Sequence, residues 1–292
     1  MKILITGANG TIGSDLVEFF SKNHKIFAFY RTSNQFSKKF KNKNISWFKN
    51  DLKNPIKNKI KPDIIIHCAV THPFSKKNKS YLDYINSNII SLKNILEFAS
   101  KNEIKKFFYL SSVKIYGNIN KKILNDENLF LNPDILGATK ILSENIISLQ
   151  KFKYYNIRLP GVLCYNISDD RRPWLNQIIF KLMNNQDINI FNSQSRFNNI
   201  IDTKEIYKLI KKIISKKTYK SESFNFSASK PIKIKIIIDH IKKRLSSKSK
   251  IYFKMKKTRN FIISSNKVSQ NFKFNIENTI NIIDRYINYK LK

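Results

Sequence analysis

The chain has little cysteine: among its 292 residues, Cys68 and Cys164 are the only two. Two widely separated cysteines cannot build the disulfide framework of a small secreted protein. The four histidines and these two cysteines also show no spacing typical of metal ligands. The sequence therefore predicts reduced, buried thiols in a cytoplasmic protein, and no metal site.

Long apolar runs are also missing. No stretch approaches the roughly 18 consecutive apolar residues that a membrane-spanning helix needs. The opening residues MKILIT lead directly into a strand-like pattern, without the charged segment and long apolar segment of a signal peptide. The sequence thus favours a cytoplasmic location and no membrane partner.

Arginine is scarce although the chain is strongly basic. The net charge is +35 and the isoelectric point about 10.1, yet 47 of the 55 basic residues are lysine and only 8 are arginine. Nucleic-acid sites favour arginine with stacking aromatic residues. Because the basic runs are short KK pairs and one KKR, we expect lysines scattered over solvated faces and no nucleic-acid partner, despite the high isoelectric point.

The first half of the chain alternates strands and helices. Apolar runs predict strands, and stripes of apolar residues at helical spacing predict the helices between them. The expected strands are 2–6, 25–30, 45–50, 63–70, 106–112 and 154–160. Three helices are expected among them: one that begins near residue 11, one over about 80–101, and one that contains Lys140. This alternation predicts an α/β fold with a Rossmann-type, doubly wound parallel sheet.

A glycine-rich turn follows the first strand. TGANGTIG (6–13) places Gly7, Gly10 and Gly13 three residues apart, immediately before the first helix. Glycine permits the tight turn and the close approach of a pyrophosphate, and the helix N-terminus offers free N–H groups to it. The loop predicts dinucleotide binding, with Asn9, Thr11 and Ile12 as further cofactor-binding residues.

The ends of the following strands suggest which dinucleotide binds. The second strand ends in Tyr30 and Arg31, where an acidic residue is usual for NAD, and an arginine suits a 2′-phosphate. NADP(H) is therefore favoured, with NAD(H) as the alternative. Asp51 is placed to accept a hydrogen bond from an adenine amine, with Leu52 against the ring. Ala69, near the end of the fourth strand, is the last candidate cofactor-binding residue.

The second half is less regular. Helices are expected near 174–184, 204–215, 232–245 and 276–288, and short strands at 188–191 and 224–228. The change in pattern predicts a dinucleotide-binding domain over 1–160. Residues 161–292 would form mainly a smaller C-terminal α/β substrate lobe, with some segments returning to the sheet.

These motifs together resemble the extended short-chain dehydrogenases/reductases of the NAD-dependent epimerase/dehydratase type. The resemblance covers nearly the whole chain and is carried by TGANGTIG, NDL, PDIIIHCAV, SSVKIYG, LGATK, RLPGV and FNFSAS. It implies an NAD(P)-dependent oxidoreductase, epimerase or dehydratase that acts on a nucleotide-activated sugar by hydride transfer.

The resemblance also assigns roles to individual residues. Ser112 would hydrogen-bond the reacting hydroxyl, and Tyr116 is the tyrosine of the same SSVKIYG motif. Lys140 would hold the nicotinamide ribose and lower the pKa of a catalytic tyrosine. Asn88 would help to order the active-site helix.

The chain departs from the family's pattern at the general acid/base. The tyrosine of the family's YxxxK motif corresponds to Leu136, and no tyrosine lies between residues 117 and 153. Leucine cannot exchange a proton, and general acid–base catalysis contributes about 10²- to 10⁴-fold. Two interpretations stay open. Tyr116 or Asp134 supplies the proton, or the chain is a degenerate member serving as a sensor, scaffold or inactive partner subunit.

The resemblance places the substrate's diphosphate against basic residues of the second half. The candidates are Arg172, Arg196 and Arg259, each of which is also consistent with an ordinary surface charge. PGVLC is not a nucleophile elbow, so hydrolase chemistry has no support. The sequence is compatible with a homodimer and does not specify one.

Overall fold

A computed structural model describes residues 1–32, 35–71, 80–166, 173–255 and 260–291. The chain divides into two compact units. The first unit comprises Met1–Asn118, Leu129–Arg158 and Tyr207–Phe224, and the second comprises Ile119–Asn128, Leu159–Ile206 and Asn225–Lys292. Each unit is therefore assembled from segments that lie far apart in the sequence.

The first unit is built on a seven-stranded sheet, in the order β12-β7-β5-β4-β1-β2-β3. The strands are β1 (Lys2–Thr6), β2 (Lys25–Tyr30), β3 (Ile45–Lys49), β4 (Ile64–His67), β5 (Lys106–Ser112), β7 (Lys153–Leu159) and β12 (Glu222–Asn225). β1 pairs in parallel with both β2 and β4, and the chain order runs outward from β1 in opposite directions. This arrangement confirms the expected Rossmann-type fold, and it places a topological switch point at the carboxyl ends of β1 and β4.

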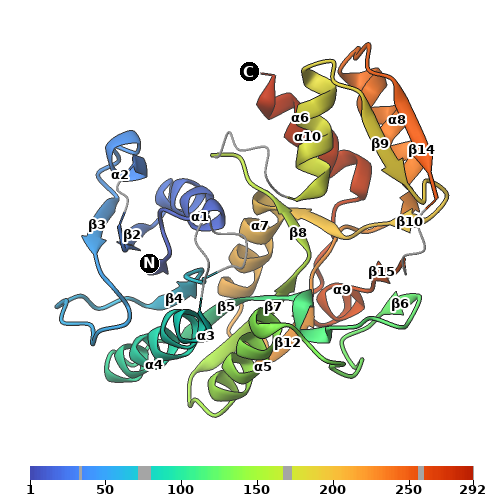
Figure 1. Cartoon of the computed structure of the whole chain (residues 1–292). Helices are drawn as coiled ribbons and strands as arrows, with labels where there is room; N and C mark the ends of the chain where they lie inside the picture. The colour runs from blue at the N-terminus through green and yellow to red at the C-terminus, as the bar shows by residue number, and fades with distance from the viewer. Residues whose placement is uncertain (33–34, 72–79, 167–172, 256–259, 292) are drawn as a thin grey trace. The chain divides into compact units, whose positions relative to one another are not determined.

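Helices cover the sheet because its central strands are apolar on both faces. The helices of this unit include α1 (Thr11–Ser21), α2 (Gln35–Lys39), α4 (Ser91–Lys101), α5 (Ile135–Ser148) and most of α7 (Thr203–Ile214). In Figure 1, α4 and α5 both lie in the lower part of the view, and α1 lies near α7 above them. Leu92 and Ile95 of α4 share a buried cluster with Leu4, Ile65 and Phe107 of the strands. The rings of Phe20 on α1 and Tyr207 on α7 meet edge to face at 4.7 Å.

The helix expected near 80–101 contains an irregular segment. It consists of α3 (Tyr81–Tyr84), a π-helical stretch (Ile85–Ile90) and α4. Ser80 and Asp83 form a reciprocal capping box at its start. π-helical turns are rare and often occur at functional sites. Here the π-helical stretch carries Asn88.

Short elements form the second unit. Its strands are β6 (Ile123–Leu124), β8 (Gly161–Leu163), β9 (Ile188–Phe191), β10 (Arg196–Phe197), β11 (Ile200–Asp202), β13 (Ile232–Lys233), β14 (Ile251–Lys254) and β15 (Ile262–Ile263). They pair as β10-β13, β11-β8, β14-β9 and β15-β6. The helices are α6 (Trp174–Met183), α8 (Ile234–Arg244), α9 (Asn266–Phe272) and α10 (Thr279–Lys290). Most of the short strands, and α9, were not expected from the sequence. A segment of a few residues is too short to show a periodic pattern of apolar side chains.

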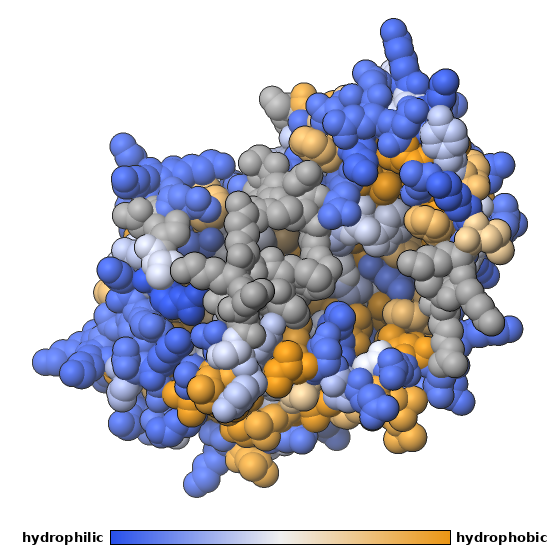
Figure 2. Space-filling view, viewed as in Figure 1, coloured by the Kyte–Doolittle hydropathy of each residue, from blue (hydrophilic) through white to orange (hydrophobic). Residues whose placement is uncertain are grey.

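Polar residues are spread over the surface visible in Figure 2 and are not gathered in one patch. Figure 2 shows hydrophilic residues spread widely over the visible face, with hydrophobic residues among them. Within the described residues, no helix combines the length and the apolar character that crossing a bilayer would require.

Candidate active site

The glycine loop brings the start of α1 directly against the end of β1. Gly7 has a φ of +64°, a left-handed conformation that glycine adopts without strain. A Cβ atom on Gly13 would lie 2.2 Å from the carbonyl oxygen of Gly7. Any side chain at Gly13 would therefore push the helix away from the loop.

The residues of this loop fit a bound diphosphate. Gly10 is the N-cap of α1 and supplies no side-chain cap, so the first amides of the helix, including those of Thr11 and Ile12, lack intrahelical acceptors. In the described part of the chain, the buried side-chain amide of Asn9 has no hydrogen-bond partner for its nitrogen or its oxygen. Free donors and the positive end of the helix dipole favour an anion at this position.

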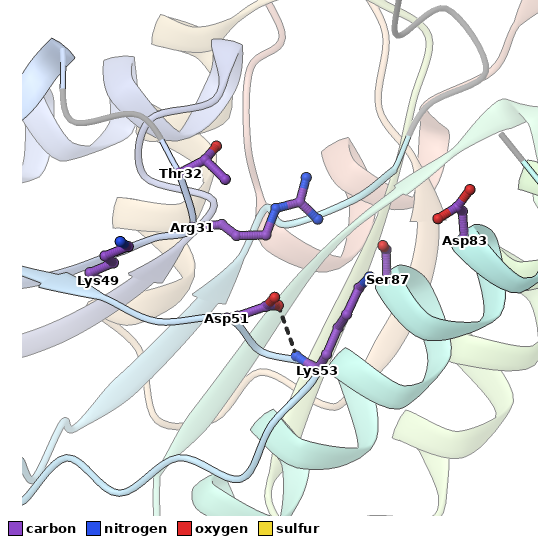
Figure 3. Close-up of a pocket in the computed structure, with 7 residues that line it drawn as sticks. All are labelled: Arg31, Thr32, Lys49, Asp51, Lys53, Asp83 and Ser87. Carbon is purple, nitrogen blue, oxygen red and sulfur yellow. Dashed lines mark hydrogen bonds between the residues drawn. The ribbon is translucent and has the colours of Figure 1, made fainter. Parts of the chain in front are cut away.

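A cavity of about 450 Å³ lies beyond the ends of β2 and β3. Its lining residues are Arg31, Thr32, Lys49, Asp51, Lys53, Asp83 and Ser87. In Figure 3 the side chains of Arg31 and Lys53 extend into the same space, with Asp51 between them. The Asp51 carboxylate accepts a 3.2 Å hydrogen bond from the backbone N–H of Lys53. Three cationic side chains and two carboxylates, those of Asp51 and Asp83, thus line a space that can hold a phosphorylated group.

Leu52 and Ala69, two further candidate cofactor-binding residues, have structural contacts within the first unit. Leu52 is 6 % exposed and belongs to the core cluster, and its carbonyl oxygen accepts a bond from Asn94. A contact between Leu52 and an adenine ring remains a prediction. The N–H of Ala69 donates to the Thr6 hydroxyl at 3.3 Å, which ties the second residue after β4 to the end of β1.

Lys140 is buried on α5, with 4 % of its surface exposed. Its ammonium donates a 2.7 Å hydrogen bond to the carbonyl oxygen of Leu110 on β5. The same nitrogen lies 4.3 Å from the centre of the Tyr109 ring. A carbonyl dipole and an aromatic face both attract a cation, so this position holds a lysine that has no carboxylate ion-pair partner among the described residues.

Burial changes the acidity of Lys140 and its neighbours. Desolvation lowers the pKa of Lys140 to about 8, although the charge of Glu144 opposes the change. Desolvation also lowers the pKa of His67 to about 3, with a smaller contribution from Lys140. The same effect raises the pKa of the Cys68 thiol to about 12. At neutral pH, His67 and Cys68 are thus uncharged.

Asn88 connects three elements around the start of α5. Its amide oxygen accepts a 2.8 Å bond from the N–H of Thr71, and its nitrogen donates to the Thr139 hydroxyl at 3.1 Å. Thr139 donates in turn to the carbonyl oxygen of Leu136. This chain of bonds fits the expected ordering role of Asn88.

Ser112 ends β5 and caps a 3₁₀ helix (Val113–Tyr116). Its hydroxyl accepts a 3.2 Å hydrogen bond from the N–H of Lys114, and the residue is partly exposed. The hydroxyl proton is not used in that bond. Ser112 can therefore donate to a bound hydroxyl or carbonyl oxygen.

Tyr116, a candidate proton donor, is buried and bonded to an arginine. Its side chain is 1 % exposed, and its hydroxyl accepts a 2.9 Å hydrogen bond from Arg158. Arg158 forms a 2.8 Å ion pair with Glu144, and Glu144 accepts a 2.5 Å bond from Ser111. The geometry favours a structural role for Tyr116 within this buried network.

Leu136 and Asp134 lie at the start of α5. Leu136 is 1 % exposed. Asp134 is the N-cap, where its carboxylate accepts a 2.9 Å bond from the N–H of Gly137 and pairs with Lys114 at 3.1 Å. The cap and the ion pair give Asp134 a structural role at the start of α5.

Of the candidate substrate-binding arginines, the structure describes only Arg196. Its guanidinium is exposed and donates to the carbonyl oxygen of Pro231 at 3.1 Å. Arg172 and Arg259 lie outside the described residues. Across the described ranges, no three His, Cys, Asp or Glu side chains gather as metal ligands.

Sequence reasoning missed several residues of the site. Lys49 and Lys53 line the cavity with Arg31, but nothing distinguishes them among 47 lysines. Thr139 and Glu144 were also missed. Their positions next to Lys140 and one helical turn after it were the available signals.

Comparison with known proteins gives consistent results. Residues 3–225 match the model of the family described as "NAD dependent epimerase/dehydratase family". The uncharacterized protein MJ1055 of Methanocaldococcus jannaschii is 26 % identical over 274 residues, covering 86 % of this chain and 83 % of that protein. The UDP-glucuronic acid 4-epimerase of Bacillus cereus, solved with NAD, is similar over 100 % of both chains, with a TM-score of 0.79 and 18 % identity. The enzyme WbmG of Bordetella bronchiseptica, solved with NAD and UDP, has a TM-score of 0.83 and 15 % identity, covering 98 % of this chain and 94 % of that one.

Proposed function

Because this chain belongs to the NAD-dependent epimerase/dehydratase family, we propose that it is a nicotinamide-dinucleotide-dependent enzyme that modifies a nucleotide-activated sugar. Its reaction would be an oxidation–reduction, epimerisation or dehydration begun by hydride transfer. The observation that carries the proposal is Lys140, buried on α5 and bound to β5, in the same structural unit as the glycine loop.

The cofactor would bind along the carboxyl ends of β1, β2 and β3. Gly7, Gly10 and the amides at the start of α1 would hold its diphosphate, and Asn9 would gain the partner that it lacks among the described residues. The cofactor itself supplies the hydride acceptor or donor. The side chains of this protein bind it, orient the substrate and move the proton.

The cavity supports a preference for NADP(H) over NAD(H). Arg31, Lys49 and Lys53 line one cavity at the ends of two adjacent strands, and Arg31 and Lys53 extend into the same space (Figure 3). A 2′-phosphate would bring up to two negative charges to these three cations, which outnumber the two carboxylates of the lining, whereas a free ribose hydroxyl would bring none. Asp51 would then accept from the adenine amine rather than from the ribose.

Ser112, Lys140 and Asn88 would form the reacting end of the site. Ser112 would donate its unused hydroxyl proton to the sugar oxygen, and Lys140 would hold the nicotinamide ribose. Asn88 would keep α5 in position through Thr139. We assign Tyr116 to the support of this region, because its hydroxyl is bonded to Arg158.

The substrate assignment rests on relatives and on one arginine. The B. cereus protein is by its title a UDP-glucuronic acid 4-epimerase, and WbmG was solved with UDP. We propose that this chain also binds a nucleoside-diphosphate sugar, with Arg196 turning from the Pro231 carbonyl to the diphosphate.

Leu136 favours a second candidate function. A leucine in place of the catalytic tyrosine is compatible with a protein that binds the dinucleotide and catalyses nothing. Such a protein would serve as a sensor, a scaffold or an inactive partner subunit.

Two measurements test these proposals. Calorimetry with NAD, NADH, NADP and NADPH on protein stripped of bound nucleotide tests the cofactor site, and binding of none of the four would refute it. Incubation with a panel of UDP-, dTDP- and GDP-sugars, followed by separation of the products, tests the enzyme. Dinucleotide binding without any sugar conversion would favour the second candidate.

A further inference from the structure

The groups that the sequence offered as replacements for the missing tyrosine are engaged elsewhere. The Tyr116 hydroxyl is bonded to Arg158, and the Asp134 carboxylate caps α5 and pairs with Lys114. Glu144, the other titratable residue on α5, is in a buried ion pair with Arg158. Lys140 is therefore the one titratable residue on this helix that has no ion-pair partner among the described residues.

We propose that Lys140 itself exchanges the proton of the reacting sugar hydroxyl, and so performs the acid–base step that a tyrosine performs in the family's usual arrangement. This inference rests on the proposed function. As the C–H bond of the sugar carbon breaks and its hydride passes to the oxidised nicotinamide dinucleotide, the O–H bond breaks as well. The proton goes to the lone pair of the neutral Lys140 amine, which leaves a carbonyl group and an ammonium ion. The return of hydride to the carbonyl carbon takes the proton back.

The position of the amine is independent of its protonation state. Both an ammonium and a neutral amine carry N–H groups, so either donates to the Leu110 carbonyl at 2.7 Å. A neutral amine bonded in this way still has its lone pair available. Lys140 thus remains fixed at the end of β5 while it gains or loses a proton.

The surroundings of Lys140 supply the neutral amine that the step needs. The groups that face it are Glu144 on its own helix, His67 and Cys68 at β4, and Tyr109 on β5. Burial raises the pKa of Tyr109, and His67 and Cys68 are uncharged near neutrality. With a pKa of about 8, about one lysine in ten is neutral at pH 7, against fewer than about one in a thousand for an ordinary lysine.

The leucine at position 136 is consistent with this role. Leu136 lies one helical turn before Lys140, and its side chain carries no phenol that could compete with the amine for the proton. Ser112 stands two residues after Leu110 on β5, so its partly exposed hydroxyl lies at the same end of the strand as the amine. The substrate oxygen would therefore meet Ser112 and Lys140 without a tyrosine between them.

Lys140→Arg is the informative substitution, since arginine keeps the charge and the N–H donors but does not lose its proton in the working pH range. We expect dinucleotide binding to persist and kcat to fall about 10²- to 10⁴-fold. Lys106→Arg is the matched control. Lys106 is also a buried lysine bonded to carbonyl oxygens, those of Ile213, Ile214 and Lys216, and its replacement should leave kcat within about twofold.

The pH profile and a direct titration complete the test. Wild-type kcat should rise with pH to a plateau with a midpoint near 8, and Lys140→Arg should lack this limb. In cofactor-free protein with ¹³C-methylated lysines, one NMR resonance should titrate near pH 8 and be absent from Lys140→Arg. If Lys140→Arg does not fold, Lys140→Met replaces it in both measurements.

The outcomes separate this inference from the proposed function. Absence of turnover by the wild type with every sugar nucleotide overturns the proposed function. Turnover that keeps its rate and its pH profile in Lys140→Arg overturns only the assignment of the proton to Lys140. A Lys140 resonance that titrates above pH 10 overturns it as well.

Discussion

The guanidinium of Arg158 and the carboxylate of Glu144 lie 2.8 Å apart, and both side chains are less than 10 % exposed. The pair joins β7 to α5 one helical turn after Lys140, and Ser111 and Tyr116 are hydrogen-bonded to it. Removing one partner of such a pair leaves a charge buried without compensation, which costs about 3–5 kcal/mol.

We therefore expect Arg158→Met and Glu144→Gln each to lower the free energy of unfolding, measured in urea, with the larger loss for Arg158→Met. The double variant Arg158→Met/Glu144→Gln should lose less than the sum of the single losses, because no unpaired charge remains. Single losses below about 1 kcal/mol would mean that water reaches the pair and screens it.

The pKa of Lys140 leads to a prediction about stability and pH. The unfolded chain keeps the lysine proton up to about pH 10.5, whereas the folded protein releases it above about pH 8. Between these values the unfolded state binds more protons, so the free energy of unfolding rises with pH. The full contribution is about 3 kcal/mol, at about 1.4 kcal/mol for each pKa unit.

Lys140→Met isolates this contribution from the general relief of charge repulsion at high pH. The difference in unfolding free energy between wild type and Lys140→Met should move in favour of the wild type as the pH rises from 7 to 10. The exposed Lys41 provides the control, since Lys41→Met should show no such trend. A flat difference for Lys140→Met would mean that its amine is well solvated.

The fold was largely predictable, because it depends on local patterns. The apolar strands 2–6, 25–30 and 106–112 and the loop at Gly7 are recognisable within a few residues of sequence. The Arg158–Glu144 pair was not, since it depends on the packing of β7 against α5. The cavity cations Lys49 and Lys53 were missed for another reason. In a chain with 47 lysines, only the register of β3 beside β2 distinguishes them from surface charges.

Cofactor preference gives a third prediction. Arg31→Ala should weaken NADPH by tenfold or more relative to NADH, because a charge-assisted hydrogen bond contributes about 1.5–3 kcal/mol. Lys53→Ala should act in the same direction, since both side chains extend into the cavity. Calorimetry measures the four affinities, with Lys41→Ala as the control for loss of one positive charge. An equal loss for both cofactors would show that Arg31 does not contact the 2′-phosphate.

Leu136→Tyr tests the departure from the family's pattern most directly. At pH 6.5 only about one Lys140 in thirty is neutral, so a proton relay through the lysine alone is slow. A phenol next to the charged Lys140 supplies a second acid–base group with a lowered pKa. We expect Leu136→Tyr to raise kcat more than tenfold at pH 6.5 and to change it little at pH 9. In an inactive protein that has merely lost the tyrosine, the gain should instead be about 10²- to 10⁴-fold at both pH values.

Leu136→Phe separates the hydroxyl from the bulk of the ring. Leu136 is 1 % exposed, and forcing an aromatic ring into a packed site costs about 1–3 kcal/mol. Both variants should therefore show a similar loss of unfolding free energy if the ring stays inside, and only the tyrosine should change the rate. If Leu136→Phe also raised kcat, the gain in Leu136→Tyr would be due to packing around α5 and not to the hydroxyl. Loss of kcat in both variants, with dinucleotide binding unchanged, would mean that the substrate needs the space that leucine leaves open.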